Sequence, residues 1–315
     1  MRVFAADLGG TQIKLGIVET GTILCSMTLD AHSEGDLRDR LPEIERNFRD
    51  LLRQCGLSLH KIQGIGFLST GLVDRKSNRI LSTNHKFDDA AQIDFTAWAK
   101  ERFDLPIKLE NDAHAALLGE WKYGAGAGCD NLVMIALGTG IGTSVLIQGK
   151  PLRGKNGQAG LLGGHLMMDP SGRSCTCPSR GCPEALASTW ALPMMLRDRP
   201  ECRSSPWAQD GAVDFRSLFQ WADRQDAQAQ KILNYSLRIW GAVAVSMIHL
   251  FAPDKIVLGG GIMRSAERIL PFIQEWVNRH AWISWNGVEV VSAQHLTSAG
   301  LLGAEILFHE DIEYI

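Results

Sequence analysis

The sequence has no excess of positive charge and no long uninterrupted apolar run, and its first residues do not have the pattern of a signal peptide. Its 32 lysines and arginines are outnumbered by 35 aspartates and glutamates, which gives a formal net charge of −3. Nucleic acids and anionic membranes are therefore not expected as partners, because neither negative surface attracts a mildly acidic protein. The apolar stretch 239–252 is interrupted and too short to span a bilayer, and no basic region with an apolar run precedes the first predicted strand. These absences favour a cytoplasmic protein.

The seven cysteines are not expected to form disulfides in a reducing compartment, so a tight cluster among them indicates a metal or catalytic site. One cluster reads H-x9-C-x-C-x4-C and consists of His165, Cys175, Cys177 and Cys182. Zn²⁺ takes four such ligands tetrahedrally, which leaves no open position and predicts a structural site. The alternative is a set of unpaired buried cysteines. We adopt that interpretation for the remaining ones, Cys25, Cys55, Cys129 and Cys202.

At 315 residues, 45% of them apolar, the chain suits two domains better than one. Near its start, the stretch 3–18 predicts a strand that ends at Asp7, a Gly-Gly turn and a second strand. The N–H groups of Gly9, Gly10 and Thr11 can point at an anion, because the two glycines lack β-carbons. Asp7 is placed to hold a hard cation such as Mg²⁺ beside that anion. The stretch therefore predicts a phosphate and metal site, or else an ordinary glycine-rich hairpin turn.

Two further polar loops follow predicted strands. The strand at 61–69 ends in Thr70-Gly71, a loop suited to hydrogen-bonding a polar ligand, and the strand at 106–110 runs into Asn111-Asp112 and then a helix. A carboxylate at the carboxyl end of a strand faces the crevice where α/β proteins bind ligands. Asp112 is thus a candidate functional residue, unless it or Asn111 only caps the helix.

Residues 131–150 repeat the opening pattern of strand, glycine-rich turn and strand, with Leu137-Gly138-Thr139-Gly140 set against Leu8-Gly9-Gly10-Thr11. The repeat indicates a duplicated domain in which both turns bind phosphate. Ala136 stands where the first copy has Asp7, so only one copy supplies a metal carboxylate. A dinucleotide-binding motif is not indicated, because the glycine spacing does not match G-x-G-x-x-G.

The second half of the chain is predicted to be mostly helical. Apolar residues recur at helical spacing over three segments, 184–197, 213–223 and 226–251. A strand at 255–262 enters Gly259, Gly260 and Gly261, which either permit close approach of a flat ligand such as adenine or form a tight strand-to-helix turn. The region 150–183 shows little periodicity and is predicted to be an inserted loop region.

Taken in order, these motifs resemble the ROK family of repressors, open reading frames and sugar kinases, within the actin-like ATPase superfold. The resemblance covers essentially the whole chain through residues 7–11, 110–113, 137–142, 175–184 and 258–261. It implies an α/β fold of two RNase H-like domains that face an interdomain cleft. Residues 1–120 and a C-terminal helix at about 300–315 would form the smaller domain, and residues 121–299 the larger one. A homodimer is implied in the same way.

The resemblance also implies transfer of a phosphoryl group from ATP to a hexose, usually at the 6-hydroxyl, with Asp112 as the general base. Sugar hydroxyls would be bound by Asn111, Asp112, His165, Glu184, Thr70, Gly71 and Asn84. The nucleotide and its Mg²⁺ would be bound by Asp7, Gly9, Gly10, Thr11, Lys14, Gly138, Thr139, Gly140, Gly259, Gly260 and Gly261, with Asp7 orienting the metal ion. Structural Zn²⁺ at His165, Cys175, Cys177 and Cys182 completes the set of cofactors, and His165 would lie between the sugar and the zinc.

One position departs from the family pattern. Family kinases read Gly-Glu-x-Gly-His at the sugar contact, whereas this chain has Leu161 in place of the glutamate and one more glycine before His165. A lost carboxylate removes an acceptor worth about 1.5–3 kcal/mol. The substitution implies an unusual sugar, a low affinity for common hexoses, or a sugar sensor without catalysis. A sugar-responsive repressor is disfavoured, because only six residues precede Asp7 where such repressors carry a DNA-binding domain.

Overall fold

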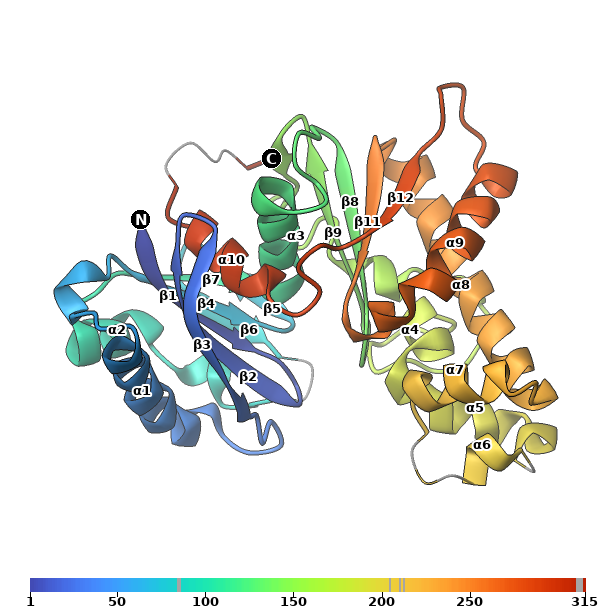
Figure 1. Ribbon diagram of the computed structural model, residues 1–315, viewed down its shortest axis with the longest axis horizontal. Coiled ribbons are helices and arrows are strands. Elements are labelled where there is room, and N and C mark those ends of the chain that lie inside the picture. Colours follow the sequence, from blue (N-terminus) through green and yellow to red (C-terminus); the bar gives the residue numbers. More distant parts are fainter. Residues whose placement is uncertain (84–85, 204, 210, 212, 310–313) are drawn as a thin grey trace. The chain divides into compact units, whose positions relative to one another are not determined.

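The computed structural model describes residues 1–83, 86–203, 205–209, 211, 213–309 and 314–315 (Figure 1). The chain divides into two compact units, which are described separately. The first comprises Met1–Gly128, Lys150–Ala159 and Thr297–Ile315, and the second comprises Cys129–Gly149 and Gly160–Leu296. The sequence patterns do not foresee that Lys150–Ala159 belongs with the first unit, because this segment lies inside the predicted loop region.

The first unit is built on a five-stranded sheet of order β3-β2-β1-β4-β7. Its strands are β1 (Arg2–Leu8), β2 (Gln12–Glu19), β3 (Thr22–Asp30), β4 (Ile65–Ser69) and β7 (Ile107–Asn111). β1, β2 and β3 form an antiparallel meander, whereas β4 runs parallel to β1 and β7 runs parallel to β4. The predicted strands on either side of the first glycine-rich turn and the two strands that precede Thr70 and Asn111 are confirmed.

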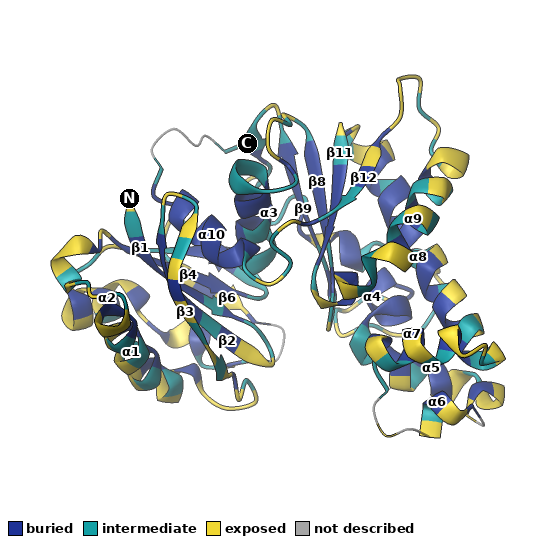
Figure 2. Ribbon diagram, viewed as in Figure 1, coloured by how far each residue is buried: buried dark blue, intermediate teal, exposed yellow. Residues whose placement is uncertain are grey.

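Helices cover both faces of this sheet (Figures 1 and 2). They are α1 (Leu37–Gln54), α2 (Phe95–Phe103), α3 (Asp112–Tyr123) and α10 (Ala299–Ile306). Successive side chains of a strand point to opposite faces, so β1 contributes to two cores. Phe4 packs with apolar side chains of α1 and α2, whereas Val3 packs with those of α3 and α10. The near-continuous apolar run of β1 thus reflects burial on both faces.

Two glycines allow α3 and α10 to approach each other closely. A β-carbon on Gly303 would overlap the carbonyl oxygen of Ala115, and one on Gly119 would overlap that of Ala299. The helices therefore meet through their backbones, which fixes α3 against the sheet. Because α3 begins directly after β7, this packing also sets the position of Asp112.

The second sheet repeats the strand order of the first, as β10-β9-β8-β11-β12. Its strands β8 (Leu132–Leu137), β9 (Ile141–Ile147), β11 (Lys255–Gly259) and β12 (Glu289–Ser292) belong to the second unit, whereas the short edge strand β10 (Lys150–Pro151) begins the segment assigned to the first unit. β9 is antiparallel to β8, β11 is parallel to β8, and β12 is parallel to β11. The corresponding strands of the first sheet are related in the same way, which confirms the predicted duplication.

The remaining helices belong to the second unit. They are α4 (Pro183–Ala187), α5 (Leu192–Asp198), α6 (Pro206–Gln209), α7 (Phe215–Asp223), α8 (Ala227–Phe251) and α9 (Ala266–His280). α8 is the helix predicted at 226–251, and the indole N–H of its buried Trp240 donates to the carbonyl oxygen of Ala187 at 2.9 Å. Although α8 has 25 residues, neither it nor any other described helix is long and apolar enough to cross a membrane.

Two details differ from the sequence predictions. The helix predicted at 184–197 is interrupted, because Ser188 has extended backbone (φ −96°, ψ 170°) between α4 and α5. The prediction that Cys25 and Cys55 are unpaired is wrong. Their sulfurs form a disulfide that joins β3 to the residue after α1, with Cα atoms 6.4 Å apart. The packing of α1 on the meander brings these cysteines together, and an argument from the cellular compartment alone misses that contact.

Candidate active site

The polar residues that end β1, β4 and β7 lie along one edge of the first sheet. The register of these parallel strands aligns Leu8 with Ser69, and Ser69 with Asn111. Asp7, Thr70 and Asp112 therefore stand at or just beyond the ends of three neighbouring strands. This carboxyl edge is where open α/β sheets bind their ligands.

Asn111 caps α3 and also binds the neighbouring loop. Its Oδ1 accepts hydrogen bonds from the N–H groups of Ala113 and His114, at 2.9 and 3.1 Å. Its Nδ2 donates to the carbonyl oxygen of Gly71 at 2.8 Å. Asn111 therefore has the capping role that was the alternative interpretation, and it leaves Asp112 at the first position of the helix.

Asp112 and Asp7 are half-buried and close enough for their charges to interact. Loss of hydration and the negative charge of Asp7 raise the pKa of the Asp112 carboxyl to about 7. The Ala113 N–H and the positive charge of Lys86 act in the opposite direction on this pKa. Burial also raises the pKa of Asp7, whereas Lys14, its neighbour on β2, lowers it. A carboxyl group with a pKa near neutrality suits a general base.

The first glycine-rich turn is tighter than the sequence predicts. The Gly9 N–H donates to the carbonyl oxygen of Gln12 at 3.0 Å, so it does not point at a ligand, contrary to expectation. Within the described part of the chain, the N–H groups of Gly10 and Thr11 have no hydrogen-bond partner. The Lys14 ammonium donates to the carbonyl oxygen of Thr297, just before α10, at 2.8 Å.

In the second unit, Glu184 packs against the other glycine-rich turn. Its Oε2 accepts the Ile141 N–H at 2.9 Å, and its Oε1 accepts the indole N–H of Trp190 at 3.4 Å. A β-carbon on Gly140 would overlap Oε2. The structure therefore places Glu184 beside Gly138, Thr139 and Gly140, and its contact with a sugar stays a prediction.

The segment Gly259-Gly260-Gly261 lies beside this turn. Gly259 pairs with Ala136, the residue that replaces Asp7 in the repeat. Gly260 has φ +88°, and a β-carbon there would overlap the carbonyl oxygen of Leu137. Only glycine meets both conditions without strain. Gly261 is exposed, and a β-carbon there would meet nothing within 4 Å, which leaves room for a ligand.

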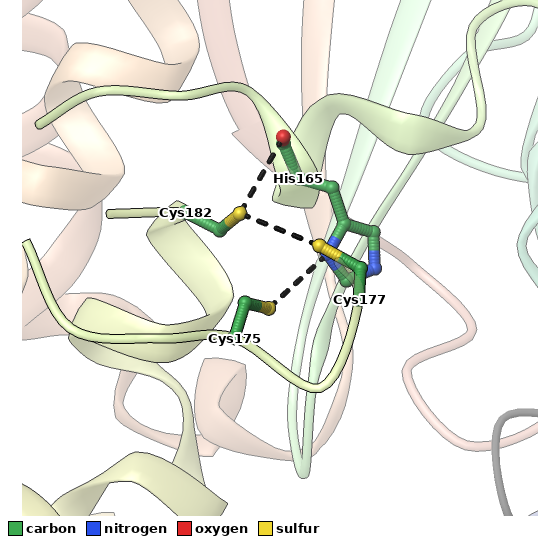
Figure 3. Close-up of side chains that lie close together, drawn as sticks. All are labelled: His165, Cys175, Cys177 and Cys182. Atoms are coloured by element: carbon green, nitrogen blue, oxygen red, sulfur yellow. Dashed lines mark hydrogen bonds between the residues drawn. The ribbon is translucent and has the colours of Figure 1, made fainter. Parts of the chain in front are cut away.

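The zinc-ligand candidates lie together in the same unit (Figure 3). His165, Cys175, Cys177 and Cys182 each offer one donor atom, and these atoms lie within 4.8 Å of one another. The sulfurs of Cys177 and Cys182 are 3.7 Å apart, and the Cys175 sulfur is 3.5 Å from His165 Nδ1. Tetrahedral Zn²⁺ with ordinary bond lengths separates its ligand atoms by about 3.5–3.8 Å. The donor set therefore fits zinc.

The sequence patterns assign no role to three charged residues, Lys86, Glu110 and Arg153. A β-carbon on Gly10 would lie 2.8 Å from Nζ of Lys86, a residue in an aperiodic segment that no pattern singles out. Glu110 is 1% exposed and forms a bidentate ion pair with Arg153, with Nη1 3.0 Å from Oε1. An acid at the end of an apolar strand is a signal for a buried cation, but it does not say which one.

Two further predicted positions behave differently from the rest. Asn84 lies outside the residues that the structure describes. Leu161, where the family pattern has a glutamate, is 8% exposed and packs inside its unit. Residue 161 therefore has no carboxylate that could accept a hydrogen bond from a sugar, unlike the glutamate of the family pattern.

Known proteins are similar to this chain over nearly its full length. The model of the ROK family matches residues 3–311. A glucokinase of Thermotoga maritima is 32% identical over 99% of this chain and 98% of its own length. The crystal structure of a ROK family glucokinase from Streptomyces griseus, in complex with glucose and AMPPNP, superimposes on this chain with a TM-score of 0.80 and 28% sequence identity. The match covers 98% of this chain and 99% of the glucokinase chain.

A xylose repressor of Bacillus spizizenii is also similar, at 27% identity over 83% of this chain and 64% of the repressor. Relatives of both kinds are thus similar to this chain over most of its length. From the match over nearly its full length, and from its two sheets of equivalent strand order, the chain belongs to the ROK family and has the actin-like α/β fold.

Proposed function

We propose that this protein is a kinase that transfers the γ-phosphoryl group of ATP to a hexose or hexose derivative. The proposed acceptor is the 6-hydroxyl of the sugar. One observation carries the proposal: Asp112, with a pKa of about 7, stands beside Asp7 and a glycine-rich turn at the carboxyl edge of the sheet. A base, a metal-binding carboxylate and backbone N–H donors are what phosphoryl transfer requires. The similarity to glucokinases supports a sugar as the acceptor.

In the proposed step the sugar hydroxyl oxygen attacks the γ-phosphorus while its proton passes to the Asp112 carboxylate. The bond between the phosphorus and the β–γ bridging oxygen breaks, and ADP leaves. General base catalysis of this kind contributes about 10²–10⁴-fold to the rate. The hydrogen bonds of Asn111 to Ala113, His114 and Gly71 would hold Asp112 in position for this step.

Asp7 fits the role of the magnesium ligand. Mg²⁺ in kinases is held by one or two carboxylates together with substrate phosphates and waters, and it neutralises phosphate charge. The Asp7 carboxylate lies half-buried just before the Gly9-Gly10 turn, and a β-carbon on Gly300 would lie 3.0 Å from its Oδ2. The first turn of α10 therefore leaves space for this carboxylate, and its helix dipole favours the ionised form.

The second unit would bind the rest of the nucleotide and hold the zinc. We assign phosphate contacts to Gly138, Thr139 and Gly140, and nucleoside contacts to Gly259, Gly260 and Gly261. Glu184 would support the first of these turns through its hydrogen bond from Ile141. Zn²⁺ bound by His165 and the three cysteines would fix the loop that contains His165, the predicted sugar contact.

The proposal is tested by replacing Asp112 with asparagine, which keeps the shape of the side chain but removes the base. Phosphoryl transfer from ATP is measured for wild type, Asp112→Asn and Asp104→Asn. Asp104 is an exposed carboxylate that follows α2 in the left-handed conformation, which asparagine tolerates, so it serves as the matched control. We expect kcat to fall about 10²–10⁴-fold in Asp112→Asn and to stay unchanged in Asp104→Asn. Undiminished transfer by Asp112→Asn would remove the base from the proposal.

A sugar sensor without catalysis is the second candidate. It is favoured by Leu161, which packs an apolar side chain where family kinases have a sugar-binding carboxylate, and by the similarity to a xylose repressor. A sensor would bind a sugar in calorimetry, yet consume no ATP in its presence. The presence of both Asp7 and Asp112 favours the kinase.

A further inference from the structure

Lys86 lies against the first glycine-rich turn of the first unit. An ideal β-carbon on Gly10 would be 2.8 Å from both Cε and Nζ of Lys86, and 3.2 Å from Cδ. The end of the lysine side chain therefore occupies the face of Gly10 that any larger residue would cover. Gly10 thus has a second reason to be glycine, besides the backbone approach of a ligand.

The ammonium group of Lys86 is also near the candidate base. Its positive charge lowers the pKa of Asp112, against the effect of Asp7, which raises it. Lys86 is half-buried, and its side chain makes no hydrogen bond or close ion pair with any described residue. By contrast, the ammonium group of Lys14, which pairs with Asp7 across the sheet, is bound to the carbonyl oxygen of Thr297. Unlike Lys14, Lys86 therefore has hydrogen-bond donors that can bind a ligand.

The N–H groups of Gly10 and Thr11 are also available to a ligand, because they have no hydrogen-bond partner among the described residues. Two backbone donors and an ammonium group with three donors thus lie together, within range of a carboxylate that can accept a proton. Such a set matches a tetrahedral anion with several oxygens. A lysine suits this role as a compact point charge on a flexible stem.

We propose that Lys86 is a catalytic residue whose ammonium group binds the oxygens of the phosphoryl group during its transfer. The inference rests on the proposed kinase activity and adds a residue to it. When the hydroxyl oxygen bonds to phosphorus and the bond to the bridging oxygen breaks, negative charge stays on the three other oxygens of the phosphoryl group. Lys86 neutralises that charge and gives up no proton, while Asp112 takes the proton of the hydroxyl. The transferring group is thus bound from the side of Gly10.

The experiment compares wild type with Lys86→Met, which keeps the length of the side chain without its charge, and Lys86→Arg, which keeps the charge. Lys76→Met is the matched control, because Lys76 is an exposed lysine in the same polar segment. The readouts are kcat for phosphoryl transfer, sugar Kd by calorimetry, and Tm. We expect kcat to fall about 10²–10³-fold in Lys86→Met, with sugar Kd and Tm unchanged, and to recover in part in Lys86→Arg. Lys76→Met is expected to match wild type.

A kcat for Lys86→Met within twofold of wild type overturns the proposal, as does equal loss in Lys86→Met and Lys86→Arg. If wild type transfers phosphoryl to no sugar, the kinase proposal fails, and titration with inorganic phosphate then decides the role of Lys86. Phosphate Kd at least tenfold weaker in Lys86→Met than in wild type supports an anion site at Lys86. Equal affinity, or no binding by wild type, contradicts it.

Discussion

Among single residues, Asp7 and Asp112 are two carboxylates of the candidate site in different electrostatic surroundings. Both are half-buried carboxylates at the same sheet edge, and desolvation raises the pKa of each. Asp7 has Lys14 opposite it on β2, which favours its ionised form. Asp112 has the charge of Asp7 beside it, which favours its protonated form. Under the proposed function, this difference suits Asp7 to the metal ion and Asp112 to the proton, because interacting carboxyls with different partners titrate differently.

The raised pKa of Asp112 predicts the pH dependence of the activity. A base must be ionised, so kcat/KM should be constant above the Asp112 pKa of about 7 and should fall tenfold per pH unit below it. Initial rates between pH 5.5 and 9 measure this limb. The Asp104→Asn variant should show the same limb, because that carboxylate is remote from Asp112. A profile that stays flat down to pH 5.5 would contradict the assignment of the base.

Two charged side chains near the candidate site, Glu110 and Arg153, compensate each other. Glu110 accepts the N–H of Asn111 at 2.8 Å and pairs with Arg153. Burial lowers the pKa of Arg153 to about 10, so it stays charged at neutral pH and compensates Glu110. A buried carboxylate without such a partner would cost several kcal/mol. The ion pair therefore ties the segment Lys150–Ala159 to β7, the strand directly before Asp112.

At the scale of elements, the crossing of α3 and α10 places Asp112. The two helices touch through Gly119 and Gly303 because neither position has room for a side chain. Gly303→Ala should therefore destabilise the protein by about 1–3 kcal/mol, although alanine favours a helix over glycine. Urea unfolding measures the change. Gly35→Ala is the control, because a β-carbon at Gly35 would meet its nearest neighbour, the His32 carbonyl oxygen, at an ordinary 3.5 Å.

Displacement of α3 by the alanine should also reduce phosphoryl transfer, since Asp112 is the first residue of that helix. A Gly303→Ala protein with wild-type stability and activity would show that the close crossing is not needed.

The loop that contains His165 has few regular elements, so a bound metal is expected to hold it. Metal analysis should find about one Zn²⁺ per chain, because the four donors form one tetrahedral site. Cys177→Ser should lose the zinc and lower Tm, whereas Cys129→Ser, outside the cluster, should keep it. A zinc-free wild-type protein with an unchanged Tm after treatment with a chelator would refute the structural zinc.

Local sequence patterns predict most elements of this fold and fewer of its contacts. Helical spacing identifies α7 and α8, and the patterns of strand followed by polar loop place Asp7 and Asp112 at strand ends. The break at Ser188 is missed, because apolar periodicity continues across it. Lys86, Arg153 and the pairing of Cys25 with Cys55 are missed as well. Each depends on segments that only the tertiary fold brings together, and no residue spacing records such a contact.

The whole molecule contains two copies of one sheet arrangement, which carry different candidate site residues. The copies share strand order and pairing direction, and each ends its first strand in a glycine-rich turn. Only the first copy has Asp7 and Asp112, whereas the second has Ala136, the three glycines at 259–261 and the zinc ligands. This difference predicts that the first unit supplies the base and the metal carboxylate, and that the second binds nucleotide and zinc. The cleft between domains, the homodimer and the cytoplasmic location expected from the sequence stay predictions.

Transfer of phosphoryl to a sugar by the wild-type protein tests the central claim most directly. The protein is incubated with ATP, Mg²⁺ and a panel of hexoses and hexose derivatives, and each mixture is analysed by mass spectrometry for a sugar monophosphate and for ADP. We predict that at least one sugar yields both products in equal amounts, and that Asp112→Asn yields them at least 100-fold more slowly. Sugar binding without any sugar phosphate, across the whole panel, would contradict the account and identify a sensor.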